Sequence, residues 1–96
     1  MLNQLRYFQA VVRCGSFTEA AEVCHISQSA MSQQIKALEQ ELGIQLLERM
    51  NRRFVLTPAG EHFYKKSLIL VADYDRLVQD TARMARKNRA TAICIA

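Results

Sequence analysis

Residues 15–43, GSFTEAAEVCHISQSAMSQQIKALEQELG, contain the start and end signals of two successive helices. Ser16 and Glu19 have the S/T-x-x-E spacing of a capping box, which predicts that a short helix begins after Ser16. Ser27 can cap a second helix, which we expect to span residues 28–42 and to end at the following glycine. Because only about three residues separate the two helices, the pattern predicts a sharp corner, as in a helix-turn-helix. A plain helical hairpin within a bundle is the alternative.

The second of these helices is expected to have one apolar and one polar face. At about 100° per residue, Met31, Ile35, Leu38 and Leu42 fall on one side, which predicts a stripe facing the core. A helix face that is merely solvated is more usually built from Glu, Lys and Arg. The opposite side instead carries hydroxyls and amides, and its first half has no charge; it comprises Ser29, Ser32, Gln33, Lys36 and Gln40.

The segment after this helix, LLERMNRRFVLT at residues 46–57, predicts a small hairpin. Leu47 and Leu56 suit a core-facing side, and the polar turn at residues 50–52 separates two short runs that favour strands. A basic hairpin beside a helix-turn-helix is a wing, whose arginines could contact phosphates or enter a narrow minor groove. A solvated turn that happens to be basic is the alternative.

A first helix is expected from about Asn3 to Cys14. The 96 residues fit one small domain, and half of them are hydrophobic, so the chain should fold. The formal net charge of +4 suggests an anionic partner but is weak support alone. The start has no basic leader, and the longest strongly apolar run, LILVA at residues 68–72, is too short to span a membrane. We therefore expect a soluble cytoplasmic protein.

The sequence lacks the patterns of a metal site or of a catalytic centre. Cys14, Cys24 and Cys94 are widely spaced, and the first two are expected to be small core residues. His25 and His62 are solitary, and no phosphate loop or nucleophile–base set appears. An enzyme is the weakest interpretation, and neither a metal nor a cofactor is expected in this chain.

A long helix should begin at Thr57-Pro58 and continue to about residue 88, a length of about 45 Å. That is too long for a small domain to cover by itself, which suggests contacts with the first helix and with a second subunit. A bundle helix within one chain and an interface for a different protein are the alternatives. The residues expected to form the dimer contact recur at heptad-like spacing: Phe63, Leu70, Tyr74, Leu77 and Met84.

The segment GSFTEAAEVCHISQSAMSQQIKALEQELGIQLLER, followed by NRRFVLTPAGE, resembles the N-terminal DNA-binding region of LysR-type transcriptional regulators. The resemblance implies a mainly α fold: a winged helix-turn-helix of three helices and a two-stranded wing over residues 1–57. It further implies a dimerising linker helix over residues 58–88. Residues 89–96 would then be the hinge and first strand of an effector-binding domain, which would bind a small-molecule effector and continue beyond this sequence.

The same resemblance implies a bacterial regulator located in the cytoplasm, on the nucleoid when bound, that forms tetramers and binds duplex DNA at interrupted palindromes near promoters. Gln33 stands where the family commonly has arginine, which bears on specificity. The residues matching the family's base-contacting positions are Gln28, Ser29, Ser32 and Gln33, and those matching its backbone or minor-groove positions are Lys36, Arg52 and Arg53.

This assignment gives the uncharged polar face a physical role. Each base pair presents a distinct pattern of donors and acceptors in the major groove, which hydroxyls and amides can recognise, whereas a lysine-rich face would attract any sequence. Two other classes stay open: a protein-interaction module with a purely structural winged domain, and a self-contained winged-helix regulator of another family.

Overall fold

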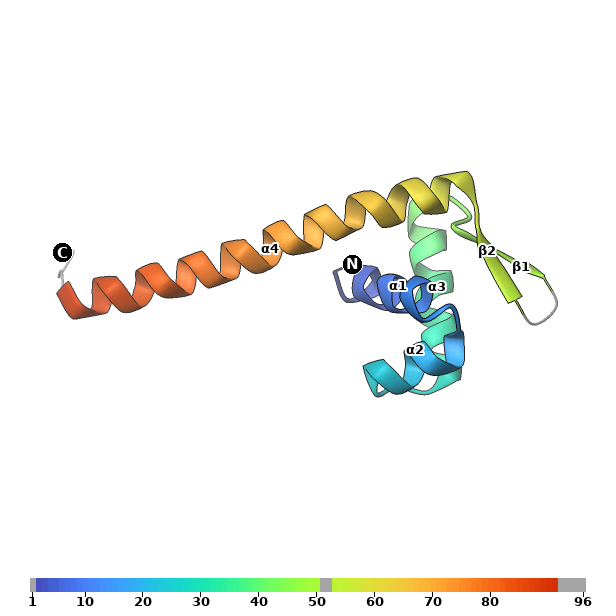
Figure 1. Ribbon diagram of the computed structural model, residues 1–96, viewed down its shortest axis with the longest axis horizontal. Coiled ribbons are helices and arrows are strands. Elements are labelled where there is room, and N and C mark those ends of the chain that lie inside the picture. The colour runs from blue at the N-terminus through green and yellow to red at the C-terminus, as the bar shows by residue number, and fades with distance from the viewer. Residues whose placement is uncertain (1, 51–52, 92–96) are drawn as a thin grey trace.

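The computed structural model describes residues 2–50 and 53–91, with side chains up to residue 87. Three short helices pack together at one end of the molecule, a hairpin flanks them, and the last helix extends far beyond them (Figure 1). The molecule therefore measures 61 × 26 × 20 Å. The mainly α winged helix-turn-helix with a long final helix is confirmed. In chain order the elements are α1 (Leu2–Cys14), α2 (Phe17–Cys24), α3 (Gln28–Leu42), β1 (Leu47–Met50), β2 (Arg53–Leu56) and α4 (Pro58–Thr91).

The core lies where α1, α2 and α3 meet. Phe8 and Val11 of α1 are completely buried against Met31, Ile35 and Leu38 of α3. These three residues belong to the predicted apolar stripe, whose fourth member, Leu42, is only partly buried against the core. The stripe is therefore confirmed as the core-facing side of that helix. Its opposite face is consequently turned away from the core.

The corner between α2 and α3 is formed by local capping. The Ser16 hydroxyl accepts a hydrogen bond from the amide of Glu19 at 3.2 Å, and the Ser27 hydroxyl caps the next helix in the same way. α2 ends at His25, which adopts a left-handed conformation with φ of 60°, and its amide donates to the carbonyl of Ala21. A histidine thus takes the position usually given to glycine, and no sequence pattern indicated this.

The hairpin is antiparallel, and Leu47 pairs with Leu56 as the predicted core-facing side requires. The carboxylate of Glu39, on α3, accepts hydrogen bonds from the amides of Leu46 at 2.7 Å and Leu47 at 3.1 Å. This side chain attaches the start of β1 to α3. The orientation of the hairpin is therefore set from α3 as well as by the buried leucines.

α4 begins with the predicted cap. The Thr57 hydroxyl accepts from the amide of Gly60 at 2.9 Å and donates to the carbonyl of Gln45 at 2.7 Å. The Thr57 amide in turn donates to the carbonyl of Leu46 at 3.0 Å. One residue thus connects the first turn of α4 to the segment that precedes β1.

α4 packs across α1 through aromatic and polar contacts. The rings of Phe8 and Phe63 meet edge to face at 5.6 Å, and the amide of Gln9 donates to the buried hydroxyl of Ser67 at 3.1 Å. An ion pair of 2.7 Å between Arg6 and Asp75 closes this contact.

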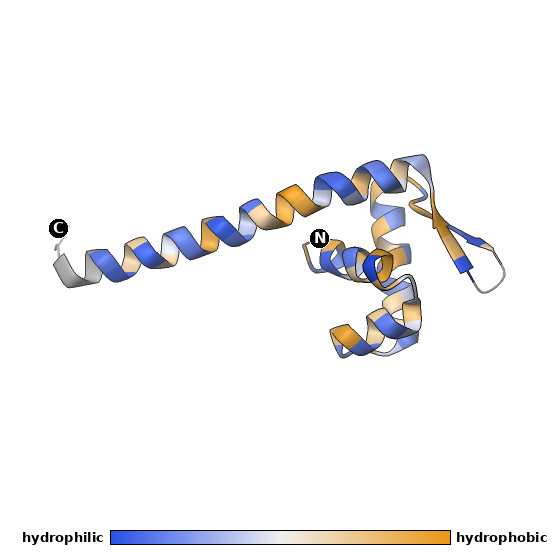
Figure 2. Ribbon diagram, viewed as in Figure 1, coloured by the Kyte–Doolittle hydropathy of each residue, from blue (hydrophilic) through white to orange (hydrophobic). Residues whose placement is uncertain are grey.

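Beyond this contact, every described side chain from Arg76 to Lys87 is exposed. Polar and apolar segments alternate along this part of α4 (Figure 2). The helix reaches Thr91 and so extends three residues beyond the predicted end of the linker helix at residue 88. The strand predicted at the end of the chain falls on residues 92–96, outside the described residues.

Candidate nucleic-acid interface

The exposed face of α3 gathers the polar side chains that the sequence indicated. Because the helix buries its opposite face, these side chains project together into solvent. The surface between them is a hollow of about 590 Å³. Its lining comprises Gln28, Ser29, Ser32, Gln33 and Lys36.

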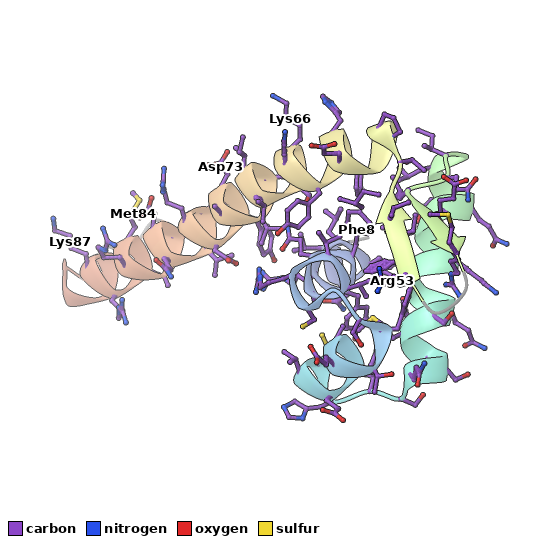
Figure 3. The ribbon with its side chains drawn as sticks, turned by 45° about the vertical axis from the view of Figure 1, so that its right-hand side comes forward. Phe8, Arg53, Lys66, Asp73, Met84 and Lys87 are labelled. Atoms are coloured by element: carbon purple, nitrogen blue, oxygen red, sulfur yellow. The ribbon has the colours of Figure 1, made fainter. Side chains whose placement is uncertain are left out.

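A second hollow, of about 460 Å³, lies between the hairpin and the starts of α2 and α3. Gln28 lines both hollows, so the two adjoin at this residue. Arg53 of β2 is exposed and lines this second hollow, close to the predicted helix face (Figure 3). Arg52, the other predicted wing residue, is outside the described residues. The full lining comprises Gly15, Ser16, Phe17, Thr18, Gln28, Arg49, Arg53 and Phe54.

Sequence reasoning missed Arg49 as a member of this surface. Its guanidinium lies 4.6 Å from the centre of the Phe17 ring and donates a hydrogen bond of 3.1 Å to the hydroxyl of Ser32. A signal was present: side chains alternate along a strand, so Arg49 shares the face of the core-facing Leu47. That alternation predicts that Arg49 points toward the helices.

The predicted dimerisation residues divide into two groups. Phe63 is partly buried against the chain's own α1, where its ring meets Phe8. The others, Leu70, Tyr74, Leu77 and Met84, are exposed large hydrophobic residues.

An apolar groove of about 590 Å³ lies beside this exposed stripe. Leu5 of α1 and Phe63 and Leu70 of α4 line its apolar part. Lys66 and Asp73, which project from α4, also line the groove and have opposite charges (Figure 3).

Two of the three cysteines, Cys14 and Cys24, lie in the described part of the chain. Cys14 and Cys24 are partly buried against the core and are not disulfide-bonded. Partial burial, and secondarily the nearby Cys14 thiol, raise the pKa of Cys24, so that this thiol stays protonated at neutral pH. Within residues 2–50 and 53–91, no group of three or more potential metal-ligating side chains is found. None of the helices in the described part of the chain has the length and apolarity needed to cross a membrane.

Comparison with known proteins identifies the family. Residues 2–61 match the family model described as bacterial regulatory helix-turn-helix protein, lysR family. The chain belongs to the LysR family. This confirms the resemblance noted in the sequence, and the matched residues contain the whole helix-turn-helix, the hairpin and the first turn of α4.

Individual relatives of this LysR-family chain agree with that assignment. It is 46% identical over 92 residues to the HTH-type transcriptional regulator BenM of Acinetobacter baylyi, covering 96% of this chain and 30% of BenM. It is 45% identical over 85 residues to the regulator BudR of Klebsiella aerogenes, covering 88% of this chain and 59% of BudR. The chain therefore spans less than two thirds of the length of either relative.

Among solved structures, the crystal structure of a BenM DBD/catB site 1 DNA complex superimposes with a TM-score of 0.87 at 46% identity. The match covers 92% of this chain and 95% of that one. The whole arrangement of helix-turn-helix, hairpin and long helix is thus shared with a protein that was crystallised on DNA.

Proposed function

We propose that this chain is a sequence-specific duplex-DNA-binding domain of a transcriptional regulator, with α3 in the major groove and the hairpin on the backbone or minor groove. The observation that carries the proposal is the exposed face of α3, where four uncharged hydrogen-bonding side chains and one lysine line a single hollow. The similarity to a BenM domain crystallised with DNA supports it. The domain's role is binding rather than catalysis.

In this arrangement, base recognition and backbone binding are assigned to different side chains. Gln28 and Gln33 can each make a bidentate contact with adenine, and the short side chains of Ser29 and Ser32 allow close approach to base edges. Lys36, Arg53 and the wing's Arg52 supply positive charge for phosphates and fix the register. Short polar side chains therefore select the sequence, while the cations provide affinity for any duplex.

Gln33→Ala should lower the affinity for the preferred site by roughly 1–3 kcal/mol, the usual range for one bidentate base contact. Binding to an unrelated duplex should barely change, because no phosphate contact is lost. Titration of both duplexes measures the difference. The matched control is Gln40→Ala, since Gln40 is exposed farther along the same face of α3 and does not line the hollow that holds Gln33. An equal loss of affinity on both duplexes would remove Gln33 from base recognition.

Arg53→Ala should weaken binding to specific and unrelated duplexes alike. The slope of log K against log salt should fall by roughly 1 unit, as expected for one lost phosphate contact. The control is Arg83→Ala, because Arg83 lies far along α4 beside Asp80 and away from the hairpin. An unchanged slope for Arg53→Ala would show that Arg53 does not contact the backbone.

We further propose that two copies associate through the exposed stripe of α4 and bind an interrupted palindrome. Four predicted dimer residues are exposed and large, and they lie on a part of α4 whose side chains are mostly exposed. The full-length regulator would then be a cytoplasmic tetramer whose C-terminal domain binds a small-molecule effector. The short coverage of the curated relatives is consistent with such a further domain.

The decisive experiment is selection of bound duplexes from a random pool near physiological salt, followed by sequencing. Enrichment of two inverted half-sites at fixed spacing would support a dimeric, sequence-reading domain. Binding without enrichment would support the phosphate contacts but contradict the proposed base recognition. An absence of binding, repeated at low salt, would favour a protein-interaction module that uses the exposed apolar stripe of α4.

A further inference from the structure

Arg49 joins three elements of the interface at one point. Its guanidinium lies over the ring of Phe17 on α2 at 4.6 Å, and its Nη2 donates to the Ser32 hydroxyl on α3 at 3.1 Å. The Phe17 ring in turn meets that of Phe54 on β2, with the ring centres 5.5 Å apart. The aromatic pair therefore provides a platform that holds the arginine against the recognition helix.

The chemistry of this contact determines how the Ser32 hydroxyl can be used. A serine hydroxyl has one hydrogen to donate and two lone pairs to accept, whereas a guanidinium has donors only. While the contact persists, one lone pair of Ser32 is occupied by Arg49 and its own hydrogen must point elsewhere. Among the hydrogen bonds of the described residues, Ser32 donates none, and it lines the open hollow of α3.

The positive charge of Arg49 strengthens the tendency of the Ser32 hydroxyl to donate a hydrogen bond. Hydrogen bonds in a chain polarise one another, so a hydroxyl that accepts from a cation becomes a better donor. By contrast, Arg53 lines the same hollow as Arg49, and no hydrogen bond from it is found in the described part of the chain. The two arginines of the hairpin therefore have different environments: Arg49 is hydrogen-bonded to α3, and Arg53 is exposed to solvent.

We propose that Arg49 is a specificity-determining positioning residue, which fixes Ser32 as a hydrogen-bond donor toward the DNA. This inference rests on the proposed DNA-binding function. In the major groove guanine presents two acceptors, thymine presents one at O4, and cytosine presents only the donor N4 amino group. With one lone pair occupied by Arg49 and its own hydrogen free, Ser32 is biased toward donating, so it prefers guanine or thymine to cytosine at the position it faces.

The test repeats the random-pool selection with the intact chain and three variants: Ser32→Ala, Arg49→Met and the double variant. The position that loses its base preference in Ser32→Ala identifies the base pair that Ser32 faces. In the unmodified chain this position should favour guanine or thymine over cytosine by about 3- to 10-fold, the range of one net hydrogen bond. Arg49→Met should reduce the ratio toward one, and the double variant should resemble either single variant.

Arg53→Met is the matched control, because it removes the same charge from the same hairpin without touching Ser32. It should lower binding to every duplex while leaving the base preference intact. In Arg49→Met, the methionine side chain keeps an apolar contact with the Phe17 ring. Thermal unfolding of each variant verifies that the fold is retained. Ser32→Ala, which places alanine in a helix, tests the same base preference from the side of α3 and leaves the hairpin sequence unchanged.

Three results would overturn the proposal: a retained preference in Arg49→Met, a preference for cytosine at the Ser32 position, or no position affected by Ser32→Ala. Each presupposes that the unmodified chain enriches a site. If it enriches none, the proposed DNA-binding function itself fails, so the two failures are distinguishable.

Discussion

Gly60→Ala should destabilise the domain by about 3 kcal/mol or more, at the upper end of the cost of overpacking. Gly60 is buried in the first turn of α4, and a β-carbon there would lie inside contact distance of the Leu46 carbonyl oxygen and 2.9 Å from its carbonyl carbon. The obstacle is backbone, so no flexible side chain can move aside. In an unobstructed helix the same substitution would stabilise by roughly 1 kcal/mol, which makes the expected sign informative.

The clash should also disrupt the attachment of α4 to the wing. The Leu46 carbonyl accepts from the amide of Thr57, and the Thr57 hydroxyl caps the amide of Gly60. A shift that accommodates a new methyl group must stretch at least one of these bonds. We therefore expect weaker binding to DNA as well, since the hairpin and α4 begin from this junction.

Urea unfolding at a fixed protein concentration measures the change, because association through α4 would make stability depend on concentration. Gly43→Ala is the control. Gly43 has φ of 67° with nothing within 4 Å of a β-carbon, so it should lose only about 1–2 kcal/mol from the left-handed backbone. If Gly60→Ala unfolds at a urea concentration no lower than that for Gly43→Ala, the close approach to Leu46 does not determine which residue is tolerated at position 60.

Local signals account for the parts of the fold that the sequence predicted. The capping hydroxyls of Ser16, Ser27 and Thr57 act within three residues of their partners, so their spacing alone located the starts of α2, α3 and α4. The 3.6-residue period of α3 likewise separated its buried face from its polar face. The base-contacting candidates could be grouped in advance because they share one helix.

Contacts between distant residues explain what the sequence did not predict. Arg49 and Ser32 are 17 residues apart, Gln9 and Ser67 are 58 apart, and the Gly60–Leu46 approach depends on the path of the loop between β1 and α3. Ser67 is buried against α1, because the crossing angle of α1 and α4 decides which residues are covered. His25 caps α2 in the left-handed conformation because the chain must turn a corner between α2 and α3. Histidine is not a residue type that indicates such a cap in a sequence.

Introducing charges at the exposed stripe, as Leu70→Glu with Leu77→Glu, should convert a dimer into monomers of 11.0 kDa. Leu70 is 57% exposed and Leu77 is 62% exposed, so the single chain gains little from burying either one. Burial of leucine surface against a second copy would be lost, and two carboxylates would require desolvation in each subunit. Sedimentation measures the mass, and the thermal unfolding of the helix-turn-helix should change little.

The spacing-matched control is Ala72→Glu with Gln79→Glu. These positions are also exposed and seven residues apart, but at about 100° per residue they lie on the opposite side of α4 from Leu70 and Leu77. The control adds the same charge to the same helix and should remain dimeric. Dimers that persist in the leucine variant would place the interface elsewhere, and monomers in both variants would point to a general effect of charge on the helix.

The leucine variant also separates the two levels of DNA recognition. Loss of the second half-site removes the gain from simultaneous engagement, which is typically 10²- to 10⁴-fold, so affinity for a palindrome should fall by about that factor. The base preferences within a half-site should persist, because Gln28, Ser32 and Gln33 lie on α3, away from both substitutions. Selection with the variant should therefore enrich single half-sites without fixed spacing. Altered half-site preferences would instead mean that α4 orients the recognition helix within each subunit.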